Sequence, residues 1–293
     1  MSVSKIPDFG SSEYHSLVDN LIKGTCIFLG AGVSKLAGYR LWTELCDGII
    51  DAFWEERHKL RNVNKDFTYS TKESLKNKKQ ENPIQVLDYL YLTDRKLFEN
   101  ALENIFEKDR KKEKTKVYEE LTPLVRPGKN VFVQTNIDKS FQRFFRIQDN
   151  DVSINPYFSK GPKTLNYLHG RIDKKKTWVF TSNQYFMNYL DENSQTFNFL
   201  VDLFKANNVL FIGYSFRDFE VKQAIWKSRS SSGGKKHFLL VEYDELKREV
   251  LEINEINYRE TYGIYFIKYN IENDGPELLL DVIKELSNTA VEL

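Results

Sequence analysis

Short apolar runs alternate with longer amphipathic stretches along this 293-residue chain. The runs have the length of buried strands. Between them, apolar side chains recur every three or four residues, which predicts helices. Strands that alternate with helices are typical of an α/β fold, in which a mostly parallel sheet is covered by helices on both faces. The predicted strands are 26–29, 131–133, 165–168, 178–180, 209–212, 237–242 and 264–268.

The composition fits a globular protein and argues against several functional classes. Hydrophobic residues make up 41% of the chain, charged residues 29%, and the net charge is +1. This balance argues against general attraction to nucleic acids or membranes, so any link to nucleic acid is expected to be indirect. Because no apolar stretch reaches the length of a signal-peptide core or a membrane span, we expect a cytoplasmic protein. The two cysteines, Cys26 and Cys46, are too few for a four-cysteine zinc site, and we predict no bound metal.

Glycine and polar residues follow four of the predicted strands. The first strand runs into GAGVS at 30–34, a turn of the kind that holds nucleotide phosphates, because glycines let the backbone approach a ligand and a helix N-terminus supplies N–H groups. QTNID at 134–138, HG at 169–170 and GYS at 213–215 follow later strands. Ligands of doubly wound sheets bind beyond the carboxyl ends of the strands, so these segments are predicted to share one site.

These four segments, extended to LHG at 168–170 and GYSFRD at 213–218, resemble the motifs of the sirtuin (Sir2) superfamily. They look most like the Sir2-like NADase domains of bacterial anti-phage defence proteins, and the resemblance covers roughly residues 20–225. It implies a Rossmann-like NAD domain with a helical insertion in place of the zinc ribbon of deacylating sirtuins. We therefore expect residues 1–293 to form a single Sir2-like catalytic domain, with its core at about 20–54 and 117–270 and the insertion at about 55–116.

The resemblance also implies roles for individual residues. Asn136 matches the family's asparagine beside the nicotinamide ribose and His169 matches its general base, so both are expected to be catalytic. Gln134, Ile137 and Arg40 depart from the usual threonine, tyrosine and proline, which questions substrate preference more than activity. The residues expected to contact NAD+ are Gly30, Ala31, Gly32, Ser34, Trp42, Thr135, Asp138, Gly213, Ser215 and Asp218.

The chemistry of the two expected catalytic side chains agrees with the resemblance. Cleavage of the nicotinamide–ribose bond develops oxocarbenium-like positive charge on the sugar. An uncharged carboxamide such as Asn136 can hold a water and the ribose hydroxyls without trapping that cation. Histidine changes charge near neutral pH, so His169 can accept a proton from water or a hydroxyl.

Each candidate also has a purely structural interpretation. A histidine before a glycine at a strand end can serve only as a hydrogen-bonding group. Serine, asparagine and aspartate are the residue types that cap helices, which is the alternative for Ser34, Asn136, Asp138 and Asp218. The aromatic-rich helices of 83–106 and 185–204 are candidates for oligomer contacts, with burial inside the domain as the alternative.

The function expected from the resemblance is that of an NAD+ glycohydrolase, which converts its substrate NAD+ to ADP-ribose and nicotinamide during abortive infection. The missing zinc ribbon favours this activity over protein deacylation. An NAD-dependent deacylase or ADP-ribosyltransferase, and a non-catalytic sensor of NAD or ADP-ribose, stay open as alternatives. Because NAD+ depletion is toxic, the resemblance implies control by homo-oligomerisation or by a separately encoded partner, such as a HerA-type ATPase or an Argonaute-like protein.

Overall fold

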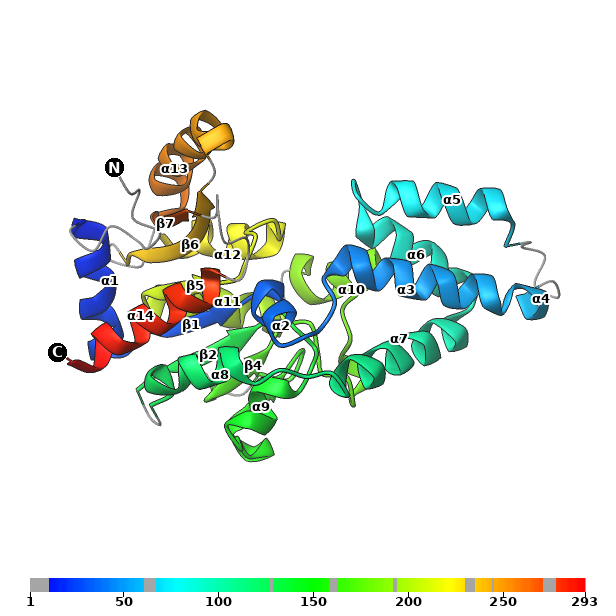
Figure 1. The fold of residues 1–293 in the computed structure, drawn as a ribbon, viewed down its shortest axis with the longest axis horizontal. Coiled ribbons are helices and arrows are strands. Elements are labelled where there is room, and N and C mark those ends of the chain that lie inside the picture. The colour runs from blue at the N-terminus through cyan, green and yellow to red at the C-terminus, as the bar shows by residue number, and fades with distance from the viewer. Residues whose placement is uncertain are drawn as a thin grey trace.

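Seven parallel strands form one central sheet in the computed structural model, which describes residues 11–60, 67–126, 129–158, 163–191, 194–229, 235–243, 245–270 and 278–292 (Figure 1). The strand order is β3-β4-β2-β1-β5-β6-β7, so the chain builds outward from β1 in both directions. This topology confirms the expected Rossmann-like α/β fold. The strands are β1 (Cys26–Leu29), β2 (Val131–Gln134), β3 (Val152–Ile154), β4 (Leu165–Tyr167), β5 (Val209–Ile212), β6 (His237–Tyr243) and β7 (Ile264–Asn270).

The strand prediction was wrong at one segment and missed another. Trp178, Val179 and Phe180 do not form a strand, although all three are buried. They follow the short helix η4 (Lys175–Thr177), and their apolar character serves packing. Strand β3 was missed because it contributes only three residues at the sheet edge and carries a serine at its centre.

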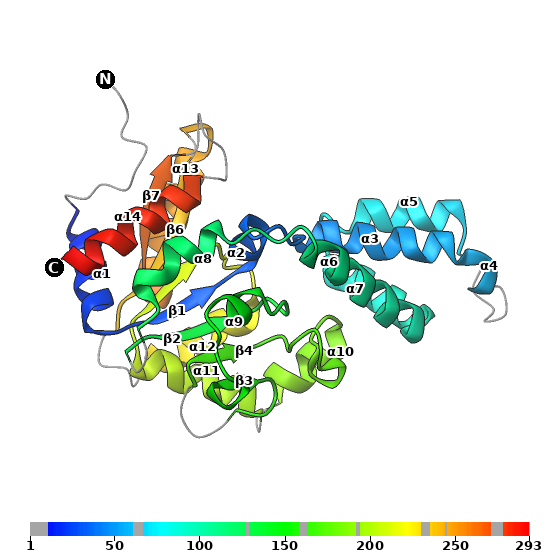
Figure 2. The ribbon, with the colours of Figure 1, turned by 60° about the horizontal axis from the view of Figure 1, so that its bottom comes forward.

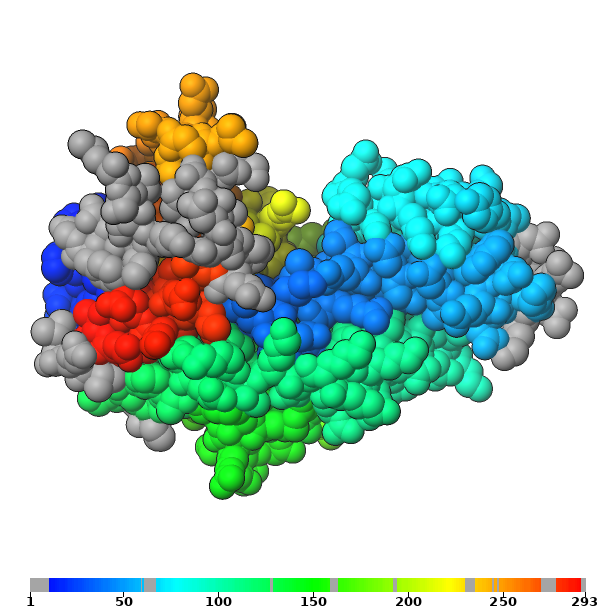
Figure 3. Space-filling model, in the orientation of Figure 1, coloured from blue at the N-terminus to red at the C-terminus, as the bar shows by residue number. Residues whose placement is uncertain are grey.

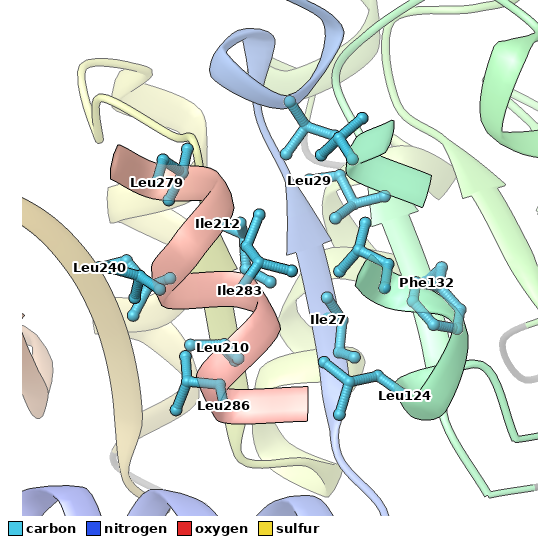
Figure 4. Close-up of a cluster of buried hydrophobic side chains, with 14 of the residues drawn as sticks. Ile27, Leu29, Leu124, Phe132, Leu210, Ile212, Leu240, Leu279, Ile283 and Leu286 are labelled. Atoms are coloured by element: carbon cyan, nitrogen blue, oxygen red, sulfur yellow. The ribbon is translucent and has the colours of Figure 1, made fainter. Parts of the chain in front are cut away.

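The two faces of the sheet receive alternate side chains. On β1, Ile27 and Leu29 pack into one apolar cluster, whereas Cys26 and Phe28 pack into another on the opposite face. Figure 4 shows Ile27 and Leu29 near Ile283 of the C-terminal helix. The first face is covered by α1 (Ser12–Lys23), α2 (Ala31–Leu36), α8 (Lys116–Leu121), α9 (Ser140–Phe144) and α14 (Leu278–Glu292). The second is covered by α11 (Gln195–Ala206), α12 (Phe219–Arg229) and α13 (Arg248–Tyr262).

A group of helices extends from the sheet domain as an arm (Figure 2). It has its own apolar cluster, built around Ile49, Leu87 and Leu102. In the space-filling view, a notch separates this arm from α13 (Figure 3). We call α3–α7 the helical arm; its members are α3 (Trp42–Glu55), α4 (Arg57–Leu60), α5 (Tyr69–Lys78), α6 (Pro83–Thr93) and α7 (Arg95–Arg110).

The arm's helices begin at recognisable signals. Thr68, Asn82 and Asp94 each accept a backbone N–H of the helix that follows, and Pro83 occupies a first helical position. Helix α3 packs on α5, α6 and α7, although all of its residues except Glu55 fall within the expected core segment 20–54. The division of the chain into domains stays a prediction. Among the described residues, none of the helices is long and apolar enough to cross a lipid bilayer.

Candidate active site

A small cavity lies where the carboxyl ends of β1, β2 and β4 meet the base of the helical arm. Its volume is about 40 Å³. Asn136 and His169, the two expected catalytic residues, both line it. The full lining is Ala31, Ser34, Tyr39, Arg40, Trp42, Leu45, Phe106, Thr135, Asn136, Ile137, Asp138, His169 and Phe180.

The glycine turn after β1 is packed tightly against the end of β5. A Cβ atom on Gly30 would lie 2.4 Å from the Gly213 carbonyl oxygen, and one on Gly32 would lie 2.8 Å from Gly213 Cα. The Gly30 amide donates to Ile212 O at 2.9 Å and the Gly32 amide to Gly213 O at 2.8 Å. Two of the amides expected to face a phosphate are therefore bonded within the chain. The glycines here are explained by backbone approach between two strand ends.

Asn136, after β2, is connected to the glycine turn. Its Nδ2 donates to Gly30 O at 2.8 Å. The side chain is half-buried and borders the cavity. The carboxamide is therefore held at the cavity wall by the same turn that closes the end of β1.

Asp138 joins two elements beside the cavity. Its Oδ2 accepts the Ser34 hydroxyl at 2.6 Å, and its Oδ1 accepts the Ser140 amide at 3.0 Å and also the Ser140 hydroxyl. The first interaction ties α2 to the end of β2, and the second fixes the start of α9. Ser34 is thus used in a bond between elements and does not cap α2, whose N-cap is Gly30. Both side chains line the cavity as well.

His169, after β4, is buried in an aromatic environment. Only 2% of its surface is exposed. The rings of Tyr185, Tyr189 and Trp42 lie nearly perpendicular to the imidazole, with centroids 5.3, 6.1 and 6.3 Å away. Neither ring nitrogen has a hydrogen-bond partner among the described residues. The nearest charged group is Glu220 on α12, whose Oε1 lies 3.6 Å from His169 Nε2. A structural role as a satisfied hydrogen-bonding histidine therefore does not fit this residue.

The segment after β5 lies beside this histidine but does not line the cavity. Asp218 accepts a hydrogen bond from the Tyr214 hydroxyl. Burial raises the pKa of the Asp218 carboxyl, and the negative charge of Glu220 raises it further. Gly213 is packed on α2, and Ser215 is exposed. Gly30, Gly32, Gly213, Ser215 and Asp218 are thus outside the cavity lining, whereas Ala31, Ser34, Trp42, Thr135, Asn136, Asp138 and His169 are in it.

Nothing in the sequence indicated that several of the residues lining the cavity would reach it. Phe106 comes from the helical arm, and Phe180 from the segment mistaken for a strand. Arg40, noted above as a departure from the family's usual proline, lines the cavity as well. It pairs with the buried Asp109 at 3.4 Å, and its guanidinium passes over Gly48, where a Cβ would meet Nη1 at 2.4 Å. The apolar periodicity that predicted the arm's helices gives no information on which residue reaches the sheet.

A larger hollow of about 390 Å³ lies on the neighbouring surface but holds none of the predicted site residues. Its walls are salt-bridged: Arg110 pairs with Glu107, and Arg143 pairs with Glu113. Paired, exposed charges of this kind are common on protein surfaces and contribute little to binding by themselves. We therefore place the candidate chemistry in the smaller cavity.

Some of the aromatic residues considered for oligomer contacts are buried in the structure and others are exposed. Tyr189, Phe197 and Phe199 are buried inside the chain, as the alternative interpretation held. Phe186 is 56% exposed. Tyr189 also donates its hydroxyl to Leu168 O at 2.9 Å, which supports the strand end that carries His169.

A comparison with known families identifies the segment that carries most of this site. Residues 130–267, from just before β2 to β7, match the family model described as the SIR2-like domain. The match supports a SIR2-like domain in this part of the chain. The match includes Asn136, His169 and Glu220, and the glycine turn lies outside it. No curated protein matches the chain.

The SIR2-like domain suggests an NAD-related function, and the side chains at the cavity are chemically suited to one. They provide a neutral carboxamide, an imidazole that makes no hydrogen bond to any described residue, and aromatic surfaces. The likeness to anti-phage proteins stays a prediction.

Proposed function

We propose that this protein hydrolyses NAD+ to ADP-ribose and nicotinamide. The observation that carries the proposal is that Asn136 and His169 line one cavity, although they follow different strands and lie far apart in the sequence. A purely structural role for either residue would not require both to border the same space. The match to the SIR2-like domain supports NAD+ as the substrate.

In the proposed reaction, water attacks the ribose carbon as the bond to nicotinamide breaks. The Asn136 carboxamide orients the water and the ribose hydroxyls. Because it carries no charge, it does not trap the positive charge that develops on the ribose. His169 accepts the proton that the water releases. Trp42, whose ring lies edge-on to His169, offers an aromatic surface for the nicotinamide ring.

We further propose that the activity serves abortive infection in the cytoplasm, under the control of oligomerisation or of a separately encoded partner. The support is the resemblance of the motifs to the defence-type Sir2 proteins. A constitutive NAD+ hydrolase would exhaust the NAD+ of the cell that makes it, so the proposal requires a trigger.

Incubation of the pure protein with NAD+, without any acceptor, tests the proposed activity. Chromatography should detect ADP-ribose and nicotinamide in equal amounts. His169→Ala should lower the rate by about 10²–10⁴-fold, the usual contribution of a positioned acid–base group. Asn136→Ala should lower it by about 10²-fold, the usual cost when a reactant is no longer oriented. The matched controls are Asn198→Ala and His58→Ala, which change exposed residues of the same types and should keep the wild-type rate.

Other products would favour the alternatives. Nicotinamide released only when an acyl-lysine peptide or an acceptor protein is added would indicate a deacylase or an ADP-ribosyltransferase. ADP-ribose binding without turnover, across protein concentrations that change the oligomeric state, would indicate a sensor. Hydrolysis that survives both alanine substitutions would refute the site assignment.

A further inference from the structure

Glu220 and His169 form a buried pair that no hydrogen bond explains. Glu220 lies in the first turn of α12 and is 7% exposed, and His169 is 2% exposed. Glu220 Oε1 and both imidazole nitrogens lack hydrogen-bond partners among the described residues. Burying a polar group without a partner costs roughly 1–3 kcal/mol, and more for a charged group. An unpartnered buried polar group calls for an explanation, and a catalytic role is one such explanation.

The Glu220 carboxylate and the His169 imidazole lie close together. The His169 Nε2 to Glu220 Oε1 distance is 3.6 Å, just beyond hydrogen-bond length. A shift of a few tenths of an ångström would complete the bond. Apo structures often show catalytic hydrogen bonds that are long and tighten only with substrate bound.

We propose that Glu220 is a positioning residue for His169, which rests on the NAD+ hydrolysis proposed above. Its carboxylate accepts the Nε2 hydrogen, holds the imidazole in the Nε2–H tautomer and leaves Nδ1 as the proton acceptor. It also stabilises the imidazolium that forms when His169 takes a proton.

The proton and electron pairs balance around this pair. As the water oxygen bonds to the ribose carbon, the carbon–nitrogen bond to nicotinamide breaks and its electron pair leaves with the nicotinamide nitrogen. The water O–H bond breaks, and its proton moves to His169 Nδ1. Glu220 accepts the Nε2 hydrogen throughout and faces the new positive charge.

The neighbouring Asp218 does not take this role. Its Oδ2 already accepts the Tyr214 hydroxyl. The pKa of Asp218 is raised, first by burial and then by the charge of Glu220, which favours the neutral acid at Asp218. Of the two carboxyl groups, Glu220 is therefore the one free to carry a negative charge toward the imidazole.

The tautomer can be read without any enzyme activity. The chain has four histidines, so protein labelled with ¹⁵N-histidine gives few signals, and His169→Gln assigns the one of interest. Long-range ¹H–¹⁵N spectra distinguish a protonated nitrogen from an unprotonated one. Wild type should show His169 in the Nε2–H tautomer. Glu220→Met, of similar length but without an acceptor, should abolish that preference.

Steady-state kinetics of two Glu220 variants separate the effect of the His169 tautomer from the effect of the carboxylate charge. Glu220→Gln keeps an acceptor for Nε2–H but removes the charge, so it should keep the tautomer and lose about 10-fold in kcat. Glu220→Met loses both and should fall by about 10²-fold, within the usual range for acid–base groups. KM for NAD+ should change less than twofold in each. Glu249→Gln, on an exposed position of α13, is the matched control and should keep the wild-type kcat.

The two proposals fail in different ways. If wild-type protein shows no NAD+ hydrolysis but Glu220→Met changes the His169 tautomer, the interaction of Glu220 with His169 is supported and the proposed hydrolase function is refuted. If NAD+ is hydrolysed and Glu220→Met changes neither kcat nor the tautomer, the pairing is overturned. Thermal melting of each variant shows whether a loss of kcat comes from unfolding.

Discussion

At the scale of the residue, neighbouring groups distinguish two buried histidines, His169 and His237. His169 lies beside a carboxylate at the cavity. His237, at the start of β6, packs its ring against Phe204 with the centroids 5.4 Å apart. Burial, followed by the positive charges of Arg229 and Lys235, lowers the pKa of His237 to about 3 from its ordinary 6.5.

The shift at His237 predicts an acid-sensitive contribution to stability. As the pH falls below 6.5, the unfolded chain binds a proton at this residue, while the native state does not until about pH 3. The free energy of unfolding should therefore fall by about 2 kcal/mol between pH 7 and pH 5 from this residue alone. Urea denaturation at the two pH values measures it. His237→Leu should remove that part of the pH dependence, and the exposed His58→Leu should retain it. Equal slopes for both variants would contradict the assignment.

The chemistry of single residues was more predictable than their partners. Asn136 and His169 could be singled out because each follows a short apolar run, and parallel strands bring their carboxyl ends together. Glu220 could not be singled out from the sequence, because its position depends on how α12 packs beside the end of β4. Acidic residues in a first helical turn are usually exposed, and nothing in the local sequence marks this one as buried.

At the scale of the element, short apolar runs located six of the strands correctly. They failed at 178–180, where Trp178 and Phe180 pack against the helical arm, Val179 packs into a cluster on the sheet, and the backbone forms no strand. The glycine turn shows the same limit. Its sequence suggested open amides for a phosphate, but the close approach of the ends of β1 and β5 occupies the Gly30 and Gly32 amides. A local pattern cannot distinguish a glycine needed for a ligand from one needed for a neighbouring strand.

The junction of β5 and α2 should therefore be sensitive to a single methyl group. Gly213 has φ of +60°, and a Cβ there would lie 2.6 Å from the Val33 amide nitrogen. Gly263 is a matched control, with φ of +66° but its nearest atom 3.5 Å away. Gly263→Ala should cost about 1–2 kcal/mol for the left-handed backbone alone. Gly213→Ala should cost about 1–3 kcal/mol more because α2 must move. Equal losses in urea denaturation would show that the close approach carries no cost.

At the scale of the whole molecule, the site lies between the sheet domain and the helical arm. Trp42 and Phe106 of the arm face Asn136 and His169 across a cavity of about 40 Å³. Sites for drug-sized ligands measure about 300–1,000 Å³, so a dinucleotide does not fit in this arrangement. The arm contacts the sheet domain through an apolar set that includes Ile137, Trp178 and Phe180. Polar contacts add to it: Asp88 accepts the amide and hydroxyl of Ser182, and Lys175 pairs with Glu99 and Glu103. Opening of the cavity would therefore have to break apolar contacts, hydrogen bonds and ion pairs between the two parts.

This arrangement predicts that the helical arm moves when a dinucleotide binds. Spin labels on Ser74→Cys of α5 and Glu249→Cys of α13, both exposed positions on opposite sides of the notch, would report the separation. Cys26 and Cys46 are buried, so the labels attach at the introduced sites. Addition of ADP-ribose should change the measured distance distribution, since the cavity must enlarge. A pair at Asp202 and Glu249, both on the sheet domain, should give the same distribution with and without ligand.

The result bears on how the activity could be controlled. If ADP-ribose binds in calorimetry and the arm-to-domain distances stay fixed, the cavity is not the dinucleotide site, and the larger hollow beside Arg143 becomes the next candidate. If the distances change, opening costs the contacts of Ile137, Trp178 and Phe180 with the arm. A partner or a second copy that stabilised the open position would then raise the apparent affinity for NAD+ without touching Asn136 or His169, because only the open fraction binds.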